Sequence, residues 1–402
     1  MNKYCLRLIF YSYFVLRTSS FAFAQVSLGI DELQKSGFEE LRGRSVALIT
    51  NQTGLDRDGD STVDILLAAP NVKLVCVLTP EHGFRGVAEH GQSVLDWVDP
   101  KTHLPIYSLY GATTRPTAAM LKGVNTVVFD IQDIGTRFYT YIATMGMALE
   151  EAAHRKLRFV VLDRPNPIRG DIIEGDILDP DIKRMTGYFQ VPTRHGLTVG
   201  ELAEWMNQTE NLNADLHVVP MKRWDRDQWF DQTGLDFTSP SPNIRSINEA
   251  LLYAGIGCFE ATNVAVGRGT ATPFEIFGAP WIKGKALCAH LRDQNFPGVL
   301  FEPVDFTPEK EVYAGQVCHG VRMIVTDRAH LEPFHIFVRA FLFLHESYPK
   351  EFKPEWEEVR VVTGSNKLRD AAEGRLSLEQ LFEAYNSALA NFREQITPFF
   401  LY

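Results

Sequence analysis

The first half of the chain alternates short apolar runs with longer mixed segments. Four apolar runs of strand length read as buried β-strands: residues 46–49, 72–78, 126–129 and 159–162. The mixed segments between them at 62–69 and 136–154 read as helices. Strands that are apolar along their whole length, with helices between them, are typical of a parallel sheet covered on both faces. The pattern predicts an α/β protein with a Rossmann-like, doubly wound parallel sheet.

Weaker signals extend this arrangement. Residues 105–109 and 216–220 are short enough and apolar enough for two further strands, and residues 117–121 read as a short helix. Thr198 and Glu201 have the spacing of a capping box, in which each side chain satisfies a backbone donor of the other residue. This pair predicts a helix that begins at residue 199.

The alternation breaks at residues 239–243, where the sequence reads Ser-Pro-Ser-Pro-Asn. Beyond it we expect a strand at 320–326 and a helical tail at 376–392. We therefore predict a Rossmann-like catalytic domain over residues 25–242. A smaller α/β (α+β) C-terminal domain over 243–402 would close the cleft.

The N-terminus has the form of a secretory signal peptide. Lys3 and Arg7 precede the apolar run 8–16, and Ala22-Phe23-Ala24 offers small residues at the spacing that signal peptidase recognises. A membrane anchor is the alternative, but it needs about 20 apolar residues, roughly twice what this run contains. We predict cleavage after Ala24, no membrane span in the mature chain, and an exported protein that is periplasmic or secreted.

Composition narrows the function. The formal net charge of −10 argues against nucleic acid as a partner, because such binding needs a basic face. An anionic substrate must instead meet local arginines. Four cysteines remain after the signal peptide, and sequence does not decide their pairing, although Cys76 reads as a buried thiol within a strand.

Candidate chemistry lies where predicted strands end, which is where ligands bind in open parallel sheets. Glu81, in Thr79-Pro-Glu-His-Gly-Phe-Arg-Gly86, follows the second strand and is the leading acid candidate. Asp130 and Asp133 follow the third strand, and Asp163 follows the fourth. Each has a structural alternative: Glu81 as an ion partner of Arg85, and Asp133 as a favourable charge at a helix start.

Nucleotide and nucleophile signatures are absent from the sequence. The chain has no GxGxxG after the first strand, no GxxxxGK[ST] and no GxSxG. The Rossmann-like layout therefore implies neither NAD nor ATP, and we expect no cofactor. No CxxC or HExxH spacing supports a zinc site.

At these motifs the chain resembles the exo-β-N-acetylmuramidases of the NamZ type. The resemblance covers nearly the whole mature chain and is carried, in order, by residues 48–54, 79–86, 129–141, 163–167, 195–198, 260–263, 267–270 and 278–281. It implies an active site in a cleft between two domains. It also implies release of terminal N-acetylmuramic acid from the non-reducing end of peptidoglycan fragments, with Glu81 as the leading catalytic carboxylate.

Glycoside hydrolysis usually needs two carboxyl groups, so we assign catalysis to Glu81 with Asp130 or Asp133, unless the substrate's N-acetyl group replaces the nucleophile. The predicted substrate-binding residues are the polar residues of the quoted motifs and their neighbours: Asn51, Gln52, His82, Arg85, Arg137, Tyr139, Arg164, Asn166, Glu174, His195, Glu260, Asn263, Arg268 and Thr270. Two other functions stay open. One is a non-catalytic sugar-binding protein of the cell envelope, and the other is a metal-dependent hydrolase with Glu81, His82, Asp130 and His195 as ligands.

Overall fold

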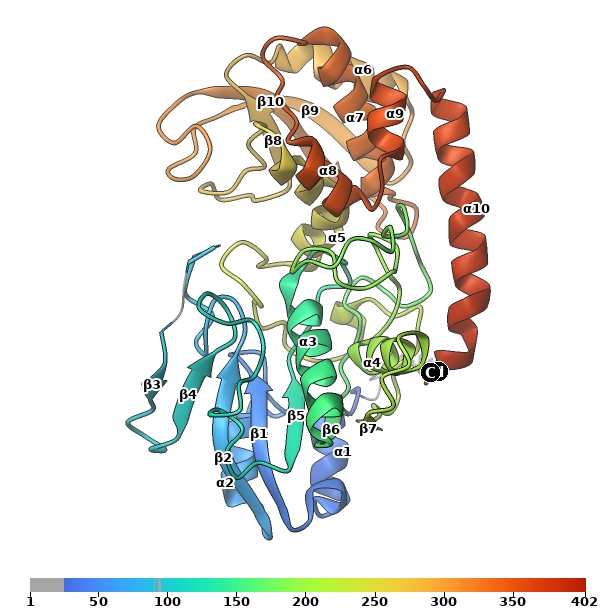
Figure 1. Ribbon diagram of the computed structural model, residues 1–402. Helices are drawn as coiled ribbons and strands as arrows, with labels where there is room; N and C mark the ends of the chain where they lie inside the picture. The colour runs from blue at the N-terminus through green and yellow to red at the C-terminus, as the bar shows by residue number, and fades with distance from the viewer. Residues whose placement is uncertain (1–24, 90, 93–94) are drawn as a thin grey trace, which may run out of the picture.

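The computed structural model describes residues 25–89, 91–92 and 95–402, so the predicted signal peptide at 1–24 lies outside the described residues. Figure 1 shows two domains, with the larger sheet in the lower one and a smaller sheet in the upper one. Among the described residues, no helix has both the length and the apolar character needed to cross a membrane.

The N-terminal domain is built on a seven-stranded sheet with the order β3-β4-β2-β1-β5-β6-β7. Its strands are β1 (Arg44–Thr50), β2 (Val72–Thr79), β3 (Trp97–Val98), β4 (Pro105–Ser108), β5 (Thr126–Asp130), β6 (Arg158–Leu162) and β7 (Asp215–Val219). All neighbouring strands pair in parallel except β3, which runs antiparallel to β4. The chain starts centrally at β1, builds outward to β4 and then crosses to β5, which confirms the doubly wound prediction.

Helices cover both faces of this sheet because successive strand residues point to opposite sides. α1 (Gly29–Lys35) and α2 (Thr62–Ala68) share one core with Val128 of β5, whereas α3 (Thr140–Arg155) and α4 (Val199–Thr209) share the other core with Val127 and Phe129. The predicted capping box of α4 is confirmed, since the Thr198 hydroxyl accepts from Glu201 N and the Glu201 carboxylate accepts from Thr198 N.

The C-terminal domain holds a three-stranded antiparallel sheet with the order β8-β10-β9. Its strands are β8 (Ile276–Ala279), β9 (Val299–Phe306) and β10 (Cys318–Val325). Its helices are α5 (Ile247–Ile256), α6 (Gly284–Asp293), α7 (Pro333–Ser347), α8 (Trp356–Thr363), α9 (Lys367–Ala372) and α10 (Leu378–Ile396). Short 3-10 helices lie at Glu39–Leu41, Phe230–Gln232, Gly257–Ala261 and Thr397–Phe399.

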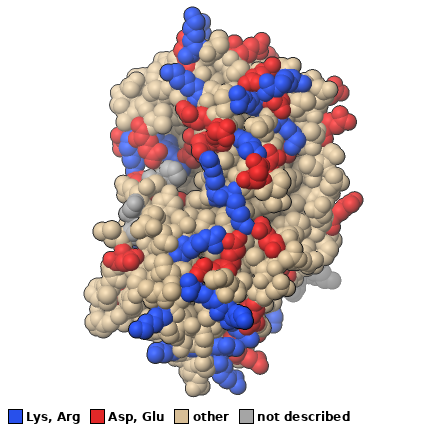
Figure 2. All heavy atoms as spheres, in the orientation of Figure 1, with Lys and Arg blue, Asp and Glu red and all other residues tan. Residues whose placement is uncertain are grey.

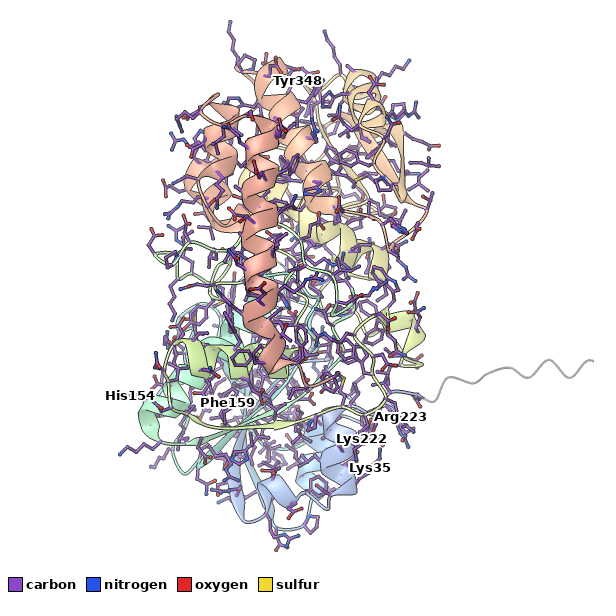
Figure 3. The ribbon with its side chains drawn as sticks, turned by 90° about the vertical axis from the view of Figure 1, so that its right-hand side faces the viewer. Lys35, His154, Phe159, Lys222, Arg223 and Tyr348 are labelled. Carbon is purple, nitrogen blue, oxygen red and sulfur yellow. The ribbon has the colours of Figure 1, made fainter. Side chains whose placement is uncertain are left out.

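The two domains are joined by more than the linker. One apolar core continues from α3 of the N-terminal domain to α7 of the C-terminal domain. α10 runs down the side of the molecule from the upper domain to the lower one (Figure 3). There Phe392 packs edge-on against Trp205 of α4, with ring centroids 5.7 Å apart. The C-terminal residue Tyr402 then donates a 2.7 Å hydrogen bond to Asp163.

Two predicted elements differ from the structure. Residues 117–121 form turns rather than a helix. α3 begins at Thr140 and not at Thr136, because Thr136 bridges Arg194 as an isolated β-pair and Arg137 N donates to Thr193 O. Backbone groups that are used in this pairing are not available for the first turn of a helix.

The four cysteines after residue 24 are free, buried thiols: Cys76, Cys258, Cys288 and Cys318. The prediction of a buried thiol at Cys76 is confirmed, and burial raises its pKa to about 12. On the surface, acidic and basic side chains are interspersed over the face shown in Figure 2, without one large field of either sign.

Candidate active site

Glu81 lies at the carboxyl end of β2, on a loop whose backbone is turned sharply. His82 and Gly83 follow it with φ angles of 70° and 72°, and a left-handed conformation is uncommon for a residue other than glycine. A 2.6 Å hydrogen bond from His82 Nδ1 to the carbonyl of Ala88 fixes this turn. Glu81 is 2% exposed, and its side chain is therefore held in one position.

Both oxygens of the Glu81 carboxylate accept hydrogen bonds. Gly91 N donates to Oε1 at 2.9 Å, and the Thr140 hydroxyl donates to Oε2 at 2.8 Å. Tyr110, just beyond β4, lies close by, since burial and then the Glu81 carboxylate raise its pKa to about 12. The three contacts come from three different segments of the N-terminal domain, two loops and the start of α3, and together they position this carboxylate.

Glu81 opens into a cavity of about 170 Å³ between the two domains. The N-terminal domain contributes Glu81, His82 and residues 138–140, and the linker contributes Ser241 and Asn243. The C-terminal domain supplies the opposite wall, which is formed by Tyr253, Gly257, Glu260, Ala261, Arg268, Phe274, Glu358 and Val362. This volume is well below the ~300–1,000 Å³ of sites for drug-sized ligands. It suits a single terminal group of a larger substrate.

Arg268 is the basic residue of this cavity wall. Its Nε donates to the Glu260 carboxylate, and its guanidinium lies 5.3 Å from the centroid of the Phe274 ring. Burial lowers the pKa of Arg268, but Glu260 outweighs burial and the net pKa is raised, so Arg268 is charged. Its two terminal nitrogens make no hydrogen bond with the residues described here. A second cavity of about 140 Å³ shares Glu260 and Arg268 and continues along residues 262–266.

Of the residues predicted from sequence, five line the cavity: Glu81, His82, Tyr139, Glu260 and Arg268. The other twelve lie elsewhere, in contacts that explain their burial or in loops that support the cavity.

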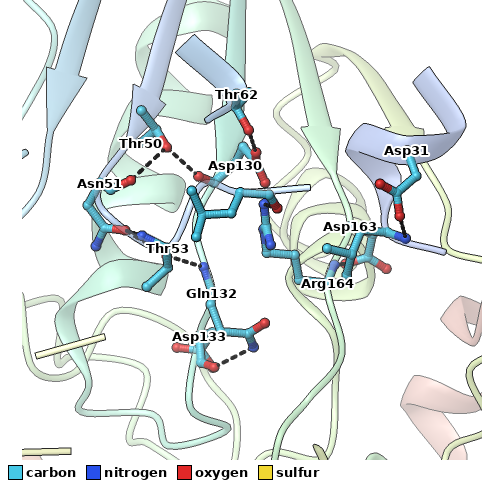
Figure 4. A network of polar contacts seen from close by, with 12 residues as sticks. Asp31, Thr50, Asn51, Thr53, Thr62, Asp130, Gln132, Asp133, Asp163 and Arg164 are labelled. Carbon is cyan, nitrogen blue, oxygen red and sulfur yellow. Dashed lines mark hydrogen bonds and ion pairs between the residues drawn. The ribbon is translucent and has the colours of Figure 1, made fainter. Parts of the chain in front are cut away.

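We expected Asp130 at the rim of the cleft, but the structure places it in the sheet, fully buried. Its Oδ1 accepts from Arg164 Nε at 2.6 Å, and its Oδ2 accepts from the Thr62 hydroxyl at 2.5 Å (Figure 4). Arg164 also donates to the carbonyl of Leu55. Asp130 and Arg164 therefore form a buried ion pair that ties the ends of β5 and β6 to α2.

Asp133 also lies outside the cavity. Its Oδ2 accepts from Gly135 N at 2.7 Å and lies 3.2 Å from Nε2 of His195. Because Leu197 N donates to His195 Nδ1, the ring proton belongs on Nε2, which points at Asp133. Both residues fix the turn before α3, so His195, which was predicted to bind substrate, does not line the cavity.

Arg137 was predicted to bind substrate, but it is fully buried between the domains. Its terminal nitrogens donate to three carbonyls, those of Asp176, Val191 and Val362. Burial lowers its pKa to about 10, so it stays charged at neutral pH. Arg85 is exposed on the loop after Glu81 and lies 6.0 Å from the Trp97 ring.

Glu174 is buried at the domain boundary, where it caps α7. Its Oε1 accepts from Phe334 N at 2.7 Å and from His335 N at 3.2 Å. Burial raises the pKa of Glu174 to about 7, although His335 and Arg194 act in the opposite direction. The Glu174 carboxyl group thus stabilises the contact between the domains.

The remaining predicted residues hold loops in place. Asn51 accepts from Thr53, Asn166 donates to the carbonyl of Leu197, and Asn263 donates to the carbonyl of Glu351. Thr270 donates to Gly267 O.

Gln52 supports the cavity from behind. Its Nε2 donates to the carbonyls of Ser239 and Pro240 at 2.9 Å each. On its other side Gly86 approaches so closely that a Cβ there would lie 2.1 Å from the Gln52 amide. Gln52 therefore clamps the linker against the loop that carries Glu81.

Sequence reasoning missed several residues of the cavity. Thr140 was read as helix interior, Ser241 and Asn243 only as a domain boundary, and Tyr253 was not singled out. The one available signal was the position of Thr140 beside Tyr139. Among residues 25–89, 91–92 and 95–402, no group of three or more His, Cys, Asp or Glu side chains is arranged to hold a metal ion.

All the residues that line the cavity lie in parts of the chain that are similar to known proteins. Residues 46–248 match the family model for the N-terminal part of the exo-beta-N-acetylmuramidase NamZ, and residues 251–402 match that for its C-terminal part. The chain is 41% identical over 379 residues to the peptidoglycan beta-N-acetylmuramidase NamZ of Bacillus subtilis (strain 168). The alignment covers 94% of this chain and 92% of that relative.

Two solved structures of DUF1343 family proteins from Bacteroides fragilis NCTC 9343 have the same fold. One superposes with a TM-score of 0.86 at 36% identity, and the other with a TM-score of 0.73 at 28% identity. Each comparison covers 94% of this chain and 99% of the other. The similarity therefore extends over both domains and the cavity between them.

Proposed function

This chain belongs to the NamZ family of exo-β-N-acetylmuramidases, which are glycoside hydrolases, and from that premise we propose what it acts on and how. Its substrates are peptidoglycan fragments with a β-linked N-acetylmuramic acid at the non-reducing end, and it releases that sugar. The observation that carries the proposal is the buried Glu81 carboxylate, which faces a cavity of about 170 Å³ with Arg268 in its wall. A cavity of this size supports exo action because one terminal sugar must enter it.

Glu81 acts as the general acid. A backbone N–H can only donate, so Gly91 fixes Oε1 as an acceptor, whereas the Thr140 hydroxyl can donate to Oε2 or accept from it. A proton on Glu81 is therefore best placed on Oε2. From there it passes to the glycosidic oxygen as the bond to the anomeric carbon breaks.

The second catalytic role falls to the substrate's own acetamido group. Asp130 and Asp133 do not line the cavity, and the other carboxylates in its wall are engaged: Glu260 by Arg268, and Glu358 by Arg184 at 2.8 Å. Some glycosidase families replace the carboxylate nucleophile by the acetamido oxygen of the substrate, which attacks the anomeric carbon. The engaged carboxylates favour that route here.

Arg268 recognises the lactyl group that distinguishes muramic acid from glucosamine. A guanidinium binds a carboxylate with two parallel hydrogen bonds, and the terminal nitrogens of Arg268 are not used by described residues. Of the four arginines among the predicted substrate-binding residues, Arg137 and Arg164 are engaged in the fold and Arg85 lies outside the cavity. This leaves Arg268 as the lactyl-binding residue.

The protein performs this reaction outside the cytoplasm. The proposal rests on the signal-peptide pattern of residues 1–24 and on the location of peptidoglycan itself. Fractionation of expressing cells, with N-terminal sequencing of the mature protein, tests it.

The function is tested with the disaccharide N-acetylmuramyl-β-1,4-N-acetylglucosamine and with longer glycans that carry the same terminus. We expect free N-acetylmuramic acid as the only monosaccharide released at first, at the same rate with and without EDTA. No release would favour a sugar-binding protein, and release that EDTA abolishes would favour a metal-dependent hydrolase. Internal cleavage of the longer glycans would contradict exo action.

A further inference from the structure

Tyr139 presents an unused hydroxyl group to the cavity. The residue is 6% exposed and lines the cavity beside Thr140, the residue that holds Glu81. No described partner meets its hydroxyl with the geometry of a hydrogen bond, although the side chains of Ser241 and Tyr141 lie near enough to lower its pKa. A buried polar group without a partner destabilises the fold, so an unfilled donor at a cavity wall indicates a ligand group that completes it.

Burial raises the pKa of Tyr139 above that of an ordinary tyrosine, and the nearby Asp133 and Glu81 carboxylates act in the same direction. The phenol is therefore neutral at the pH of any bacterial compartment. A neutral phenol donates a hydrogen bond well and is a poor nucleophile. It suits a neutral acceptor such as a carbonyl oxygen.

Aromatic rings connect Tyr139, on the N-terminal side of the cavity, to Arg268 on the opposite wall. Arg268 lies over Phe274, the ring of Phe274 lies 4.8 Å from that of Tyr253, and Tyr253 lies 6.0 Å from Tyr139. Next in the chain comes Thr140, which holds Glu81. The lining of the cavity thus presents, in order from the C-terminal to the N-terminal side, a cation, apolar rings, a neutral donor and the acid.

The substituents of N-acetylmuramic acid follow the same order. Carbon 3 carries the lactyl carboxylate, carbon 2 the acetamido group and carbon 1 the glycosidic oxygen. If Arg268 meets the first and Glu81 the last, as in the proposed function on which this step rests, the middle group faces Tyr139. The surrounding rings of Phe138, Tyr253 and Phe274 offer an apolar surface for the acetyl methyl group.

We infer that Tyr139 is a substrate-contact residue whose hydroxyl donates a hydrogen bond to the carbonyl oxygen of the 2-acetamido group. This contact selects 2-acetamido sugars over sugars with a 2-hydroxyl group. It also holds the acetamido oxygen in a fixed orientation beside the anomeric carbon. The selection is independent of the lactyl contact made by Arg268.

The test measures ligand binding rather than turnover, so that it does not depend on Glu81. Calorimetry with N-acetylmuramic acid, and with its analogue that carries a 2-hydroxyl in place of the acetamido group, gives two Kd values for wild type and for Tyr139→Phe. We expect Tyr139→Phe to raise the Kd for N-acetylmuramic acid about tenfold and the Kd for the analogue less than twofold, because only N-acetylmuramic acid loses a hydrogen bond. An equal loss for both ligands, or no loss for either, would overturn the inference.

Tyr141→Phe is the matched control. Its ring lies 4.7 Å from that of Tyr139, but its hydroxyl donates to the carbonyl of Pro240 at 2.5 Å. We expect it to lower the melting temperature while keeping the wild-type ratio of the two Kd values. A change of that ratio in Tyr141→Phe as large as in Tyr139→Phe would assign the selectivity to packing and overturn the inference.

Turnover of para-nitrophenyl N-acetyl-β-muramide and its N-trifluoroacetyl analogue gives an independent readout. The fluorinated carbonyl is a weaker acceptor, so Tyr139→Phe should narrow the ratio of the two kcat/KM values by about threefold or more. An unchanged ratio in an active Tyr139→Phe enzyme would overturn the contact but leave the proposed function standing. A wild-type enzyme that neither binds N-acetylmuramic acid nor releases it would refute both.

Discussion

At the residue scale, the proposal depends on Glu81. Glu81→Gln keeps the shape of the side chain. The amide can still accept from Gly91 N and bond the Thr140 hydroxyl, but it cannot deliver a proton. We expect kcat on a muramic acid glycoside with a poor leaving group to fall ~10²-fold or more, with an unchanged melting temperature. Asp130→Asn is the contrasting variant, because it breaks the buried pair with Arg164. It should cost ~3 kcal/mol of stability and spare kcat in the folded fraction. Similar kcat losses in both folded variants would contradict this division of roles.

Arg268 carries the second prediction at this scale. Arg268→Ala removes the guanidinium that faces the lactyl carboxylate, at a cost of ~1.5–3 kcal/mol in kcat/KM for muramic acid glycosides. The kcat/KM for the corresponding glucosaminide should change little. Arg85→Ala, at an exposed position outside the cavity, is the control and should leave both values unchanged. Equal losses on both substrates for Arg268→Ala would remove it from lactyl recognition.

Sequence predicted the position of Glu81 because a carboxylate directly after an apolar run must emerge at the end of a strand. It did not separate Arg268 from Arg137, since both follow glycine- or acid-rich loops. Their difference arises from tertiary contacts: the carbonyls of Asp176, Val191 and Val362 converge on Arg137, and they lie 39, 54 and 225 positions further along the chain. Contacts across such sequence distances leave no local pattern.

At the element scale, the start of α7 is stabilised by a side chain from the other domain. Glu174 accepts from two backbone N–H groups of its first turn, and burial raises the pKa of Glu174 to about 7 from an ordinary 4.5. The folded state binds the Glu174 proton more tightly than the unfolded state does. The contribution of this proton to the free energy of unfolding is therefore largest below about pH 4.5. It decreases as the pH rises to about 7 and does not change further above that pH.

Glu174→Gln removes this titration while keeping an acceptor for α7. The free energy of unfolding of the variant, relative to wild type, should increase by ~1–3 kcal/mol between pH 5 and pH 8. Urea unfolding at each pH measures it. Asp163, whose pKa burial raises to about 7, titrates over the same range but is present in both proteins, so its contribution cancels. A difference between the two proteins that does not vary with pH would contradict the raised pKa of Glu174.

Elements with strong local signals were predicted well. The strands of the large sheet and the capped start of α4 agree with the sequence pattern within one or two residues. The start of α3 was placed four residues too early, because the pairing of Thr136 with Arg194 competes with the helix. That competitor lies 58 positions along the chain, where periodicity within a window does not detect it.

At the scale of the whole molecule, sequence predicted the doubly wound sheet and the second domain but not how tightly the domains are joined. The linker was read as a boundary, yet Ser241 and Asn243 of that segment line the cavity. Asp176 of the N-terminal domain also accepts from Ser365 and Lys367 of the C-terminal domain. The cavity is therefore formed by two surfaces that are fixed to each other, which suits a small terminal sugar better than a hinged cleft would.

Arg137 tests this rigid connection. Its guanidinium is fully buried and donates to carbonyls of both domains, so Arg137→Lys replaces a planar group that makes three hydrogen bonds by an ammonium that cannot reach all three acceptors. We expect a loss of ~3 kcal/mol or more of unfolding free energy.

Because one apolar core continues through both domains, the Arg137→Lys variant should unfold in a single transition at a lower urea concentration and not in two transitions. Far-UV circular dichroism and tryptophan fluorescence should give coincident urea curves, because the N-terminal domain contains Trp97, Trp224 and Trp229, the C-terminal domain contains Trp281 and Trp356, and Trp205 lies at the contact with α10. If one domain instead unfolded first while the other stayed folded, the domains would be independent units, and the fixed cavity that the proposed exo action requires would lose its structural basis.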